Sequence, residues 1–359
     1  MSGRAVTPQT TAGTLPSGER PWRTDGLSPN VQIIQMAIAI WAARAVYAAA
    51  RLGLADFLAA GPRTVQELAR STGTHAQSLH RLLRALASQG VVTENEPRQF
   101  ALTPLGAALR TDAPGAARST IMTLAGDWQW KAWDHFLYSL QTGKPAMARA
   151  HGMGVFEYLA AHPEDSARFN EAMVGLYGGV GAAVVGSYDF SRFKTVVDVG
   201  GGTGSLLAEI LRANDIARGI LLERPEVIPQ ARQAIEAANL SARCQMIAGD
   251  FFVALPAGHD AYILAHVLHD WTDEQALAIL RNCRAAIAKD GRLLIVEAVL
   301  PAGDAPHHSK LIDLVMLTVT GGVERSAEEF ASLLAAADFR LLKIHPTPTH
   351  QSIVEAALA

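Results

Sequence analysis

The chain has 359 residues, 49% of them hydrophobic, and a formal net charge of −3 at neutral pH. That length and apolar share suffice for about two domains with separate cores, and the slightly acidic balance argues against a protein whose main partner is nucleic acid. The two cysteines, Cys244 and Cys283, exclude a disulfide framework and fit a reducing cytosol, so the expected compartment is the cytoplasm.

The N-terminal 50 residues divide into a polar tail and an apolar segment. Residues 1–26 are rich in Pro, Gly, Ser and Thr and lack the apolar region of a signal peptide, so they predict a flexible tail. Residues 31–50 predict an apolar helix that is interrupted by Gln32, Gln35 and Arg44. Because these polar groups break the apolar run, the helix is not expected to span a membrane.

Residues 27–115 predict a winged-helix domain. The sequences TVQE at 64–67 and THAQ at 74–77 each carry the hydroxyl and the acid or amide of a capping box, so each predicts the start of a helix. Gly90 ends the second of these helices, and residues 91–100 predict a β-hairpin wing. Two helices joined by a turn and followed by a wing are typical of this domain.

A winged helix is also compatible with another function, that of a transcriptional regulator whose second helix binds DNA. That helix carries His75, His80, Arg81 and Arg84. The charge argues against this reading, because the wing carries Glu94 and Glu96 where a DNA-binding protein favours lysine or arginine. No nucleic-acid partner is therefore expected.

The next segment, residues 116–190, is rich in large side chains at helical spacing. They include Met122, Trp128, Trp130, Trp133, Phe136, Met153, Phe156, Met173 and Tyr177. Aromatic residues at this spacing are usually core, so only about a third are expected to reach a ligand. Residues 151–154 (HGMG) are either a loop over a cleft or only a turn.

Residues 195–204 (TVVDVGGGTG) predict a buried strand that runs into a glycine turn and a helix. Such a turn lets the backbone approach a ligand closely, so Gly200 and Gly202 are candidate ligand contacts. These two glycines begin the dinucleotide fingerprint, but Ser205 does not complete it, so hydride transfer is not the first choice. A plain tight turn is the alternative.

Three further strands end in groups that suit an adenosine-like ligand. Glu223 ends a strand about twenty residues on, where a carboxylate can accept both ribose hydroxyls, although a solvated glutamate is the alternative. Asp250 and Phe251 end the next strand, and offer an acceptor for an adenine amino group and an aromatic face. A fourth strand continues into His269 and Trp271, at the edge where open α/β sheets place their ligands.

The motifs DVGGGTG, GDFF, LHDW, LLIVEAVLP and GGVERSAEEF occur in order over nearly the whole chain. Together they resemble the S-adenosylmethionine-dependent O-methyltransferases of the plant caffeate and bacterial polyketide-tailoring type. The resemblance implies an α/β fold: a Rossmann-like class I methyltransferase domain with a seven-stranded, mostly parallel sheet over residues 191–359. It is preceded by linking helices that contribute to the acceptor pocket (116–190) and by a winged-helix domain (27–115) that forms a homodimer.

The same resemblance implies the cofactor and the catalytic groups. S-adenosylmethionine would be held by Gly200, Gly202, Glu223, Asp250, Phe251 and Trp271. His269 would be the catalytic base, with Glu297 and Glu324 flanking and orienting its ring. The chemistry agrees, because a phenol of pKa about 10 keeps its proton at neutral pH and an imidazole of pKa about 6.5 can take it. This scheme requires no metal.

The implied acceptor is a hydroxyl of an aromatic small molecule in secondary metabolism, in contact with Met173, Tyr177 and Met316. Two residues depart from the family pattern: Glu223 stands where aspartate is usual, and Ala265 where lysine or serine is frequent. N- or C-methylation, or another reaction on the same scaffold, remains the alternative. His269 would matter little to it, because a nucleophilic nitrogen needs no proton removed first.

Overall fold

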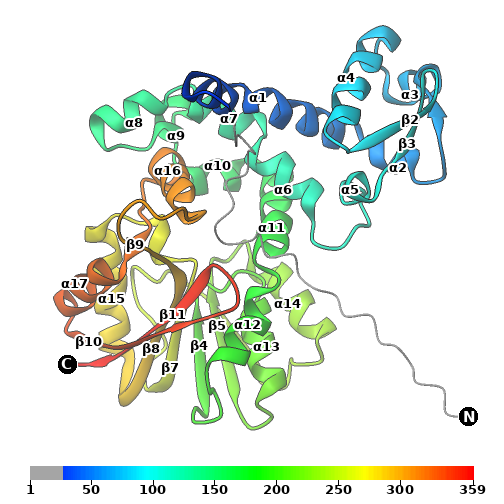
Figure 1. The fold of residues 1–359 in the computed structure, drawn as a ribbon. Coiled ribbons are helices and arrows are strands. Elements are labelled where there is room, and N and C mark those ends of the chain that lie inside the picture. Colours follow the sequence, from blue (N-terminus) through cyan, green and yellow to red (C-terminus); the bar gives the residue numbers. More distant parts are fainter. Residues whose placement is uncertain (1–26) are drawn as a thin grey trace, which may run out of the picture.

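The computed structural model describes residues 27–359 (Figure 1). The predicted flexible tail over residues 1–26 lies outside the described residues. The described chain forms an N-terminal domain, a set of linking helices and a sheet domain, and the linking helices lie between the other two (Figure 1).

The N-terminal domain has the predicted helices and wing. Its elements are α1 (Pro29–Leu52), α2 (Leu54–Leu58), β1 (Arg63–Thr64), α3 (Val65–Thr72), α4 (Ala76–Ser88), β2 (Val92–Glu96) and β3 (Gln99–Leu102). The three strands pair in the order β1-β3-β2 and are antiparallel. Leu79, Leu83 and Leu86 of α4 are buried in the domain core, which accounts for their helical spacing in the sequence.

Only one of the two predicted capping boxes forms. Thr64 accepts from the backbone N–H of Glu67, whose carboxylate accepts from the Thr64 amide, and α3 begins there as predicted. The prediction at residues 74–77 is wrong: α4 begins at Ala76 with His75 in the N-cap position and no side-chain cap. The Thr74 hydroxyl lies 2.8 Å from the Thr72 hydroxyl instead, because α3 continues to Thr72 and brings the two side chains together.

Helix α1 is long and apolar enough to cross a membrane by length and composition alone, despite its polar residues. That it does not span one stays a prediction. Yet it is tied to the rest of the protein, since Arg44 donates to the carbonyl of Ala125 at 3.1 Å and its guanidinium stacks on Trp130. Large apolar side chains on α1 are solvent-exposed, among them Ile33 at 63% and Trp41 at 69%.

The N-terminal domain ends with the short helix α5 (Pro104–Ala107). The linking region that follows is mainly helical and contains α6 (Ala117–Leu124), α7 (Asp127–Trp133), α8 (Phe136–Thr142), α9 (Ala146–His151), α10 (Val155–Ala161), α11 (Pro163–Tyr177) and α12 (Val180–Ser187). Trp128 and Tyr158 pack in one small core, as aromatic residues at helical spacing usually do. Residues 151–154 form the end of α9 and a turn, in which Gly152 has φ of 75° and the His151 ring is hydrogen-bonded to the Trp128 carbonyl.

The C-terminal domain has the predicted sheet. Its strands are β4 (Thr195–Val199), β5 (Arg218–Glu223), β6 (Cys244–Ala248), β7 (His259–Ala265), β8 (Ile287–Leu300), β10 (Phe339–Pro346) and β11 (Gln351–Leu358). They run in the order β10-β11-β8-β7-β4-β5-β6, with β11 antiparallel to its neighbours and the pairs from β8 to β6 parallel. A two-residue strand, β9 (Arg325–Ser326), pairs with the end of β8.

Helices cover both faces of this sheet. α15 (Asp273–Ala286) and α17 (Ala327–Ala336) pack on one face, and α12, α13 (Ser205–Ala213) and α14 (Ile228–Ala237) on the other (Figure 1). α16 (Ser309–Val319) lies between the sheet and the linking helices. Strands buried on both faces read as apolar runs, which explains the valines of β4. The carboxyl ends of the parallel strands meet at one edge, which faces the linking helices (Figure 1).

Candidate active site

The glycine turn after β4 forms the floor of the site. Gly200, Gly202 and Gly204 have φ of 69°, 58° and 77°, a conformation that favours glycine. A Cβ at Gly200 would lie 3.3 Å from the Phe251 ring, so the backbone there is closely packed. A Cβ at Gly202 would meet nothing within 4 Å, which leaves open space beside this peptide.

Glu223 holds the glycine turn from the end of β5. One carboxylate oxygen accepts from the backbone N–H of Gly202 at 2.9 Å, and the other accepts from that of Arg224 at 2.8 Å. The predicted ribose acceptor therefore lies against the turn, and its two oxygens retain further lone pairs for a ligand.

Asp198, which the sequence analysis did not single out, lies under the same turn. Its side chain is buried against Gly201, and neither oxygen has a hydrogen-bond partner in the part of the chain that the structure describes. Burial, and then the charge of Glu223, raise the pKa of this carboxyl to about 7. An acidic residue between Val197 and Val199 in a fully buried strand was the signal that could have identified it.

The predicted adenine contacts come from two neighbouring loops. Asp250 is exposed just beyond β6, and one of its oxygens accepts from the amide of Phe252 at 2.8 Å. The rings of Phe251 and Phe252 contact the Trp271 ring, with centroids 6.0 and 4.8 Å apart. The structure therefore brings Gly200, Phe251 and Trp271 together, as their positions at adjacent strand ends predicted.

His269 is buried in a short 3-10 helix, Leu268–Asp270, that follows β7. Its Nδ1 lies 2.8 Å from a carboxylate oxygen of Glu324, which is held beside it because β9 pairs with the end of β8. Glu297 acts on the backbone instead: its carboxylate accepts from the His269 amide at 3.1 Å. The two predicted partners thus have different tasks, since Glu324 orients the ring and Glu297 fixes the peptide that carries it.

The surrounding carboxylates control the protonation of His269. Burial alone would lower the pKa of the imidazole, but Asp270, the hydrogen bond to Glu324 and the charge of Glu297 raise it to about 10. Burial also raises the pKa of Glu297 to about 7 and that of Asp270 to about 6. At neutral pH the ring is therefore predominantly an imidazolium.

Arg325 braces this arrangement, and the sequence analysis did not single it out. The side chain is 1% exposed, and its guanidinium donates to the carbonyl of Leu268 at 3.0 Å and to that of Trp271 at 3.1 Å. It also donates to Asp273 at 2.8 and 3.0 Å. The carbonyls bracket His269 in the chain, so Arg325 fixes the loop on both sides of the imidazole. Its position directly after Glu324 was the only signal in the sequence.

Of the three predicted substrate contacts, Tyr177 lies beside the segment that carries His269. Its ring stacks on His266 with centroids 3.7 Å apart, and burial with the charges of Glu324, Asp270 and Glu297 raises the pKa of its hydroxyl. Met173 is half-buried one turn earlier on α11. Met316 is half-buried on α16, where its sulfur accepts from the Thr320 hydroxyl at 3.8 Å.

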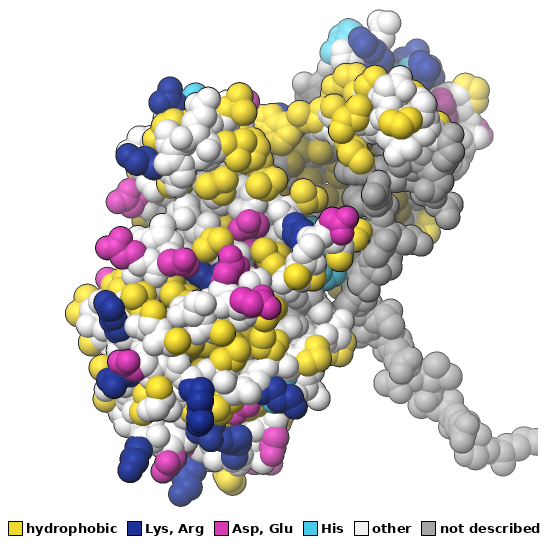
Figure 2. Space-filling view, turned by 60° about the vertical axis from the view of Figure 1, so that its left-hand side comes forward, with side chains coloured by type: hydrophobic (Ala, Val, Ile, Leu, Met, Phe, Trp, Pro, Cys, Tyr) yellow, Lys and Arg dark blue, Asp and Glu magenta, His cyan; other side chains and the backbone are white. Residues whose placement is uncertain are grey.

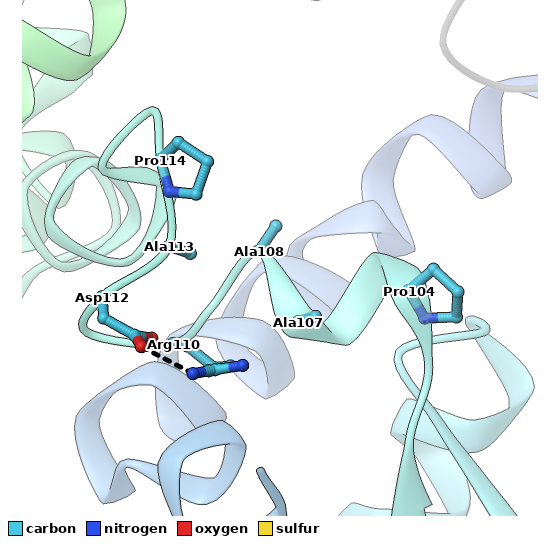
Figure 3. A pocket seen from close by; sticks show the side chains of 7 residues that line it. All are labelled: Pro104, Ala107, Ala108, Arg110, Asp112, Ala113 and Pro114. Carbon is cyan, nitrogen blue, oxygen red and sulfur yellow. Dashed lines mark hydrogen bonds and ion pairs between the residues drawn. The ribbon is translucent and has the colours of Figure 1, made fainter. Parts of the chain in front are cut away.

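Two hollows outlined on the surface lie away from these residues. One, of about 420 Å³, lies beside Arg81 and Arg84 of α4. Figure 3 shows the other, of about 390 Å³, where Arg110 and Asp112 form an ion pair. It is lined by Pro104, Ala107, Ala108, Arg110, Asp112, Ala113 and Pro114. Among residues 27–359, no group of three or more His, Cys, Asp or Glu side chains is arranged to hold a metal ion.

Comparisons with known proteins agree with this geometry. Residues 133–340 match the O-methyltransferase domain model, and residues 34–112 match the O-methyltransferase dimerisation domain model. The chain is 46% identical over 324 residues to the phenazine O-methyltransferase of Lysobacter antibioticus, covering 90% of this chain and 95% of that protein. It is 36% identical over 314 residues to the 8-amino-8-demethylriboflavin N,N-dimethyltransferase of Streptomyces davaonensis, covering 86% and 90%.

A solved structure is similar over nearly the same length. It is an O-methyltransferase from neocarzinostatin biosynthesis in complex with S-adenosylmethionine and 2-hydroxy-5-methyl naphthoic acid. The TM-score is 0.79 at 37% sequence identity, with 89% of this chain and 96% of that chain covered.

Proposed function

Because this chain belongs to the S-adenosylmethionine-dependent O-methyltransferase family with an N-terminal dimerisation domain, we propose that His269 is its general base and that its acceptor is an aromatic hydroxyl compound of secondary metabolism. Methyl transfer and the cofactor follow from the family. The acceptor and the role of each residue are our proposal, and they rest on the site described above.

The residues at the strand ends fit the cofactor. S-adenosylmethionine supplies, when bound, a methyl group on a positively charged sulfur. Glu223 would accept from the ribose hydroxyls and Asp250 from the adenine amino group, with Phe251 and Trp271 beside the base. Gly202 leaves open space in which the backbone can approach it, and Gly200 allows the turn to pack closely against Phe251. Asp198 supports this assignment, because a buried carboxyl without a partner is costly unless a ligand cation or donor satisfies it.

One observation carries the catalytic proposal: the buried contact between His269 Nδ1 and Glu324, at 2.8 Å. This contact leaves Nε2 as the nitrogen that can take the acceptor proton, and it stabilises the imidazolium that forms. Once the imidazolium has lost its proton, the raised pKa of His269, about 10, matches that of a phenol at about 10, so proton transfer between them is nearly balanced. Met173, Tyr177 and Met316 would form the wall of the acceptor pocket.

The first test is calorimetric titration with S-adenosylmethionine and with S-adenosylhomocysteine, followed by a screen of aromatic hydroxyl compounds for a methyl-sized mass gain. We expect micromolar binding of both nucleosides and methylation of at least one compound. Gly202→Trp and Glu223→Ala should each abolish cofactor-dependent methylation, because the first fills the open space at the turn and the second removes the ribose acceptor. Methylation that survives in both variants would refute the cofactor site.

N-methylation is the second candidate, favoured by the similarity to an N,N-dimethyltransferase. An amine nitrogen is already nucleophilic, so His269→Ala should leave its methylation rate almost unchanged, whereas methylation of a hydroxyl should fall steeply. Comparing amino and hydroxyl versions of one aromatic compound in this variant separates the two candidates.

We also propose that the chain forms a homodimer through its N-terminal domain. Hydrophobic side chains gather on the upper part of the molecule, over the N-terminal and linking helices (Figure 2). Exposed apolar residues there include Ile33, Ile34 and Trp41 of α1, with Leu137 and Leu140 of α8. A second copy would cover this face, so neither a membrane nor nucleic acid is proposed as a partner, and a cytoplasmic location remains a prediction.

A further inference from the structure

His266 has an unusual backbone for its residue type. It follows β7 directly and has φ of 55°, in the left-handed region that residues other than glycine seldom adopt. Its amide donates to the carbonyl of Val296 at 3.1 Å, which holds the bend against the neighbouring strand β8. Strained conformations of this kind persist mainly where the site needs the side chain in one place.

The bend places the His266 ring between two groups of the proposed active site. It stacks on Tyr177 with centroids 3.7 Å apart, and its centroid lies 5.7 Å from that of His269. Its Nε2 is buried and has no hydrogen-bond partner among the described residues. Such an atom requires a partner, because an unpaired buried polar group is costly.

The charge state of this ring is also defined by its surroundings. Burial, and then the positive charge of His269, lower the pKa of His266 well below its ordinary value. At neutral pH the ring is therefore neutral, with one N–H donor and one lone-pair acceptor in either tautomer. It can donate to a ring nitrogen or a carbonyl oxygen, and unlike an imidazolium it does not repel a cationic cofactor.

We propose that His266 is a specificity-determining residue that binds a heteroatom next to the reacting hydroxyl, and that the acceptors are therefore aromatic hydroxyl compounds with a ring nitrogen or carbonyl oxygen in the ortho or peri position. This inference rests on the proposed function, because it takes His269 as the group that meets the hydroxyl. Tyr177 holds the His266 ring in its plane by stacking.

The geometry suits such a pair of atoms. A hydroxyl and a neighbouring heteroatom that share an internal hydrogen bond lie about 2.8 Å apart. Two imidazoles with centroids 5.7 Å apart can each direct a nitrogen to one of these atoms. The internal bond would otherwise keep the hydroxyl proton from the base. Donation from His266 to the heteroatom replaces that bond and leaves the hydroxyl free to donate to His269.

A matched pair of probes tests the proposal. 8-Hydroxyquinoline and 1-naphthol differ only in the ring atom next to the hydroxyl, which is nitrogen in the first and C–H in the second. We would measure the dissociation constants of both by calorimetry, with S-adenosylhomocysteine saturating and a chelator present. The quantity of interest is the ratio of the two constants, because it cancels general changes in the pocket. Binding is measured without turnover, so the result does not depend on methyl transfer.

We express the preference as the dissociation constant of 1-naphthol divided by that of 8-hydroxyquinoline. This ratio should be about 10- to 100-fold higher in the wild-type protein than in variants without the imidazole. His266→Phe keeps an aromatic ring for the stack, and His266→Gly removes the side chain without backbone strain, so one serves if the other fails to fold. Both should lose the preference. His75→Phe, the same replacement at an exposed position on the N-terminal domain, should retain it.

An unchanged ratio in both His266 variants would overturn the proposal. A wild-type protein that binds neither probe would also overturn it. The proposed function and the His266 subsite can be refuted independently. Methylation of hydroxyl compounds with an unchanged ratio would leave the proposed function standing without this subsite. The predicted ratio with no methylation of any hydroxyl compound would refute the proposed function and retain the binding subsite.

Discussion

The surface of α1 and the surroundings of His269 depart from the usual burial pattern in opposite directions. On α1, large apolar side chains such as Ile33 and Trp41 face solvent. Around His269, charged groups are buried, and within residues 27–359 the second oxygen of Glu324 and the Nε2 of His266 have no hydrogen-bond partner. Exposed apolar surface is satisfied by another protein surface, whereas buried polar atoms are satisfied by a polar ligand. The two regions therefore call for partners of different chemistry.

The largest effect is expected at the polar region. His269→Ala should lower kcat for a hydroxyl acceptor about 10²- to 10⁴-fold, because general base catalysis is lost. Cofactor affinity by calorimetry should change little, since the glycine turn and Glu223 remain. His259→Ala, at the opposite end of the strand that leads to His269, is the matched control and should behave like the wild type. Equal kcat in the two variants would mean that positioning alone drives the reaction.

Removing the brace behind His269 should cost stability. Arg325→Met removes the buried guanidinium's hydrogen bonds to the carbonyls of Leu268 and Trp271 and its ion pair with Asp273, so the free energy of unfolding in urea should fall by about 3 kcal/mol. Arg284→Met is the control, because its ion pair with Asp338 lies on the surface, and it should cost about 0–1 kcal/mol. Similar losses in both variants would contradict the bracing role of Arg325.

The apolar region can be broken separately. Replacing Trp41 and Ile33 with glutamate should weaken the dimer at least about 10-fold by sedimentation velocity, because each buries a charge in the proposed interface. Ile216→Glu changes an equally exposed apolar residue on the sheet domain and should leave the association unchanged. A wild-type protein that is monomeric at all concentrations would refute the proposed interface.

A subtler test uses pH. Since the pKa of His269 is raised to about 10, kcat/KM should increase with pH through the neutral range as the imidazolium loses its proton. Glu324→Gln removes a negative charge and a charged hydrogen-bond acceptor, so this rise should move to lower pH while the maximal rate falls. The raised pKa also means that the ionised ring contributes stability fully below about pH 6.5, lost as pH approaches 10. A pH profile that does not move in Glu324→Gln would contradict the assigned contact.

The sequence predicted those features that depend on local patterns. The strand β4, the glycine turn and the position of Glu223 follow from buried-strand composition and from the rule that parallel strands end at one edge. The predicted capping box at Thr74 is wrong because the Thr74 hydroxyl pairs with the Thr72 hydroxyl and does not cap α4. A capping pattern in the sequence does not reveal such a contact. His266 and Arg325 escaped notice because their roles arise from contacts across the chain, with Tyr177 in one case and Leu268 in the other.

The contact between Glu223 and the amide of Gly202 ties the end of β5 to the glycine turn after β4. The proposed nucleoside site is therefore built from the backbone of the fold itself. The residues proposed for this site contact the adenine and the ribose, which are the same in S-adenosylmethionine and in S-adenosylhomocysteine. Those contacts alone would not distinguish the substrate from its demethylated product. We therefore expect product inhibition, with sustained turnover depending on the removal of S-adenosylhomocysteine from solution.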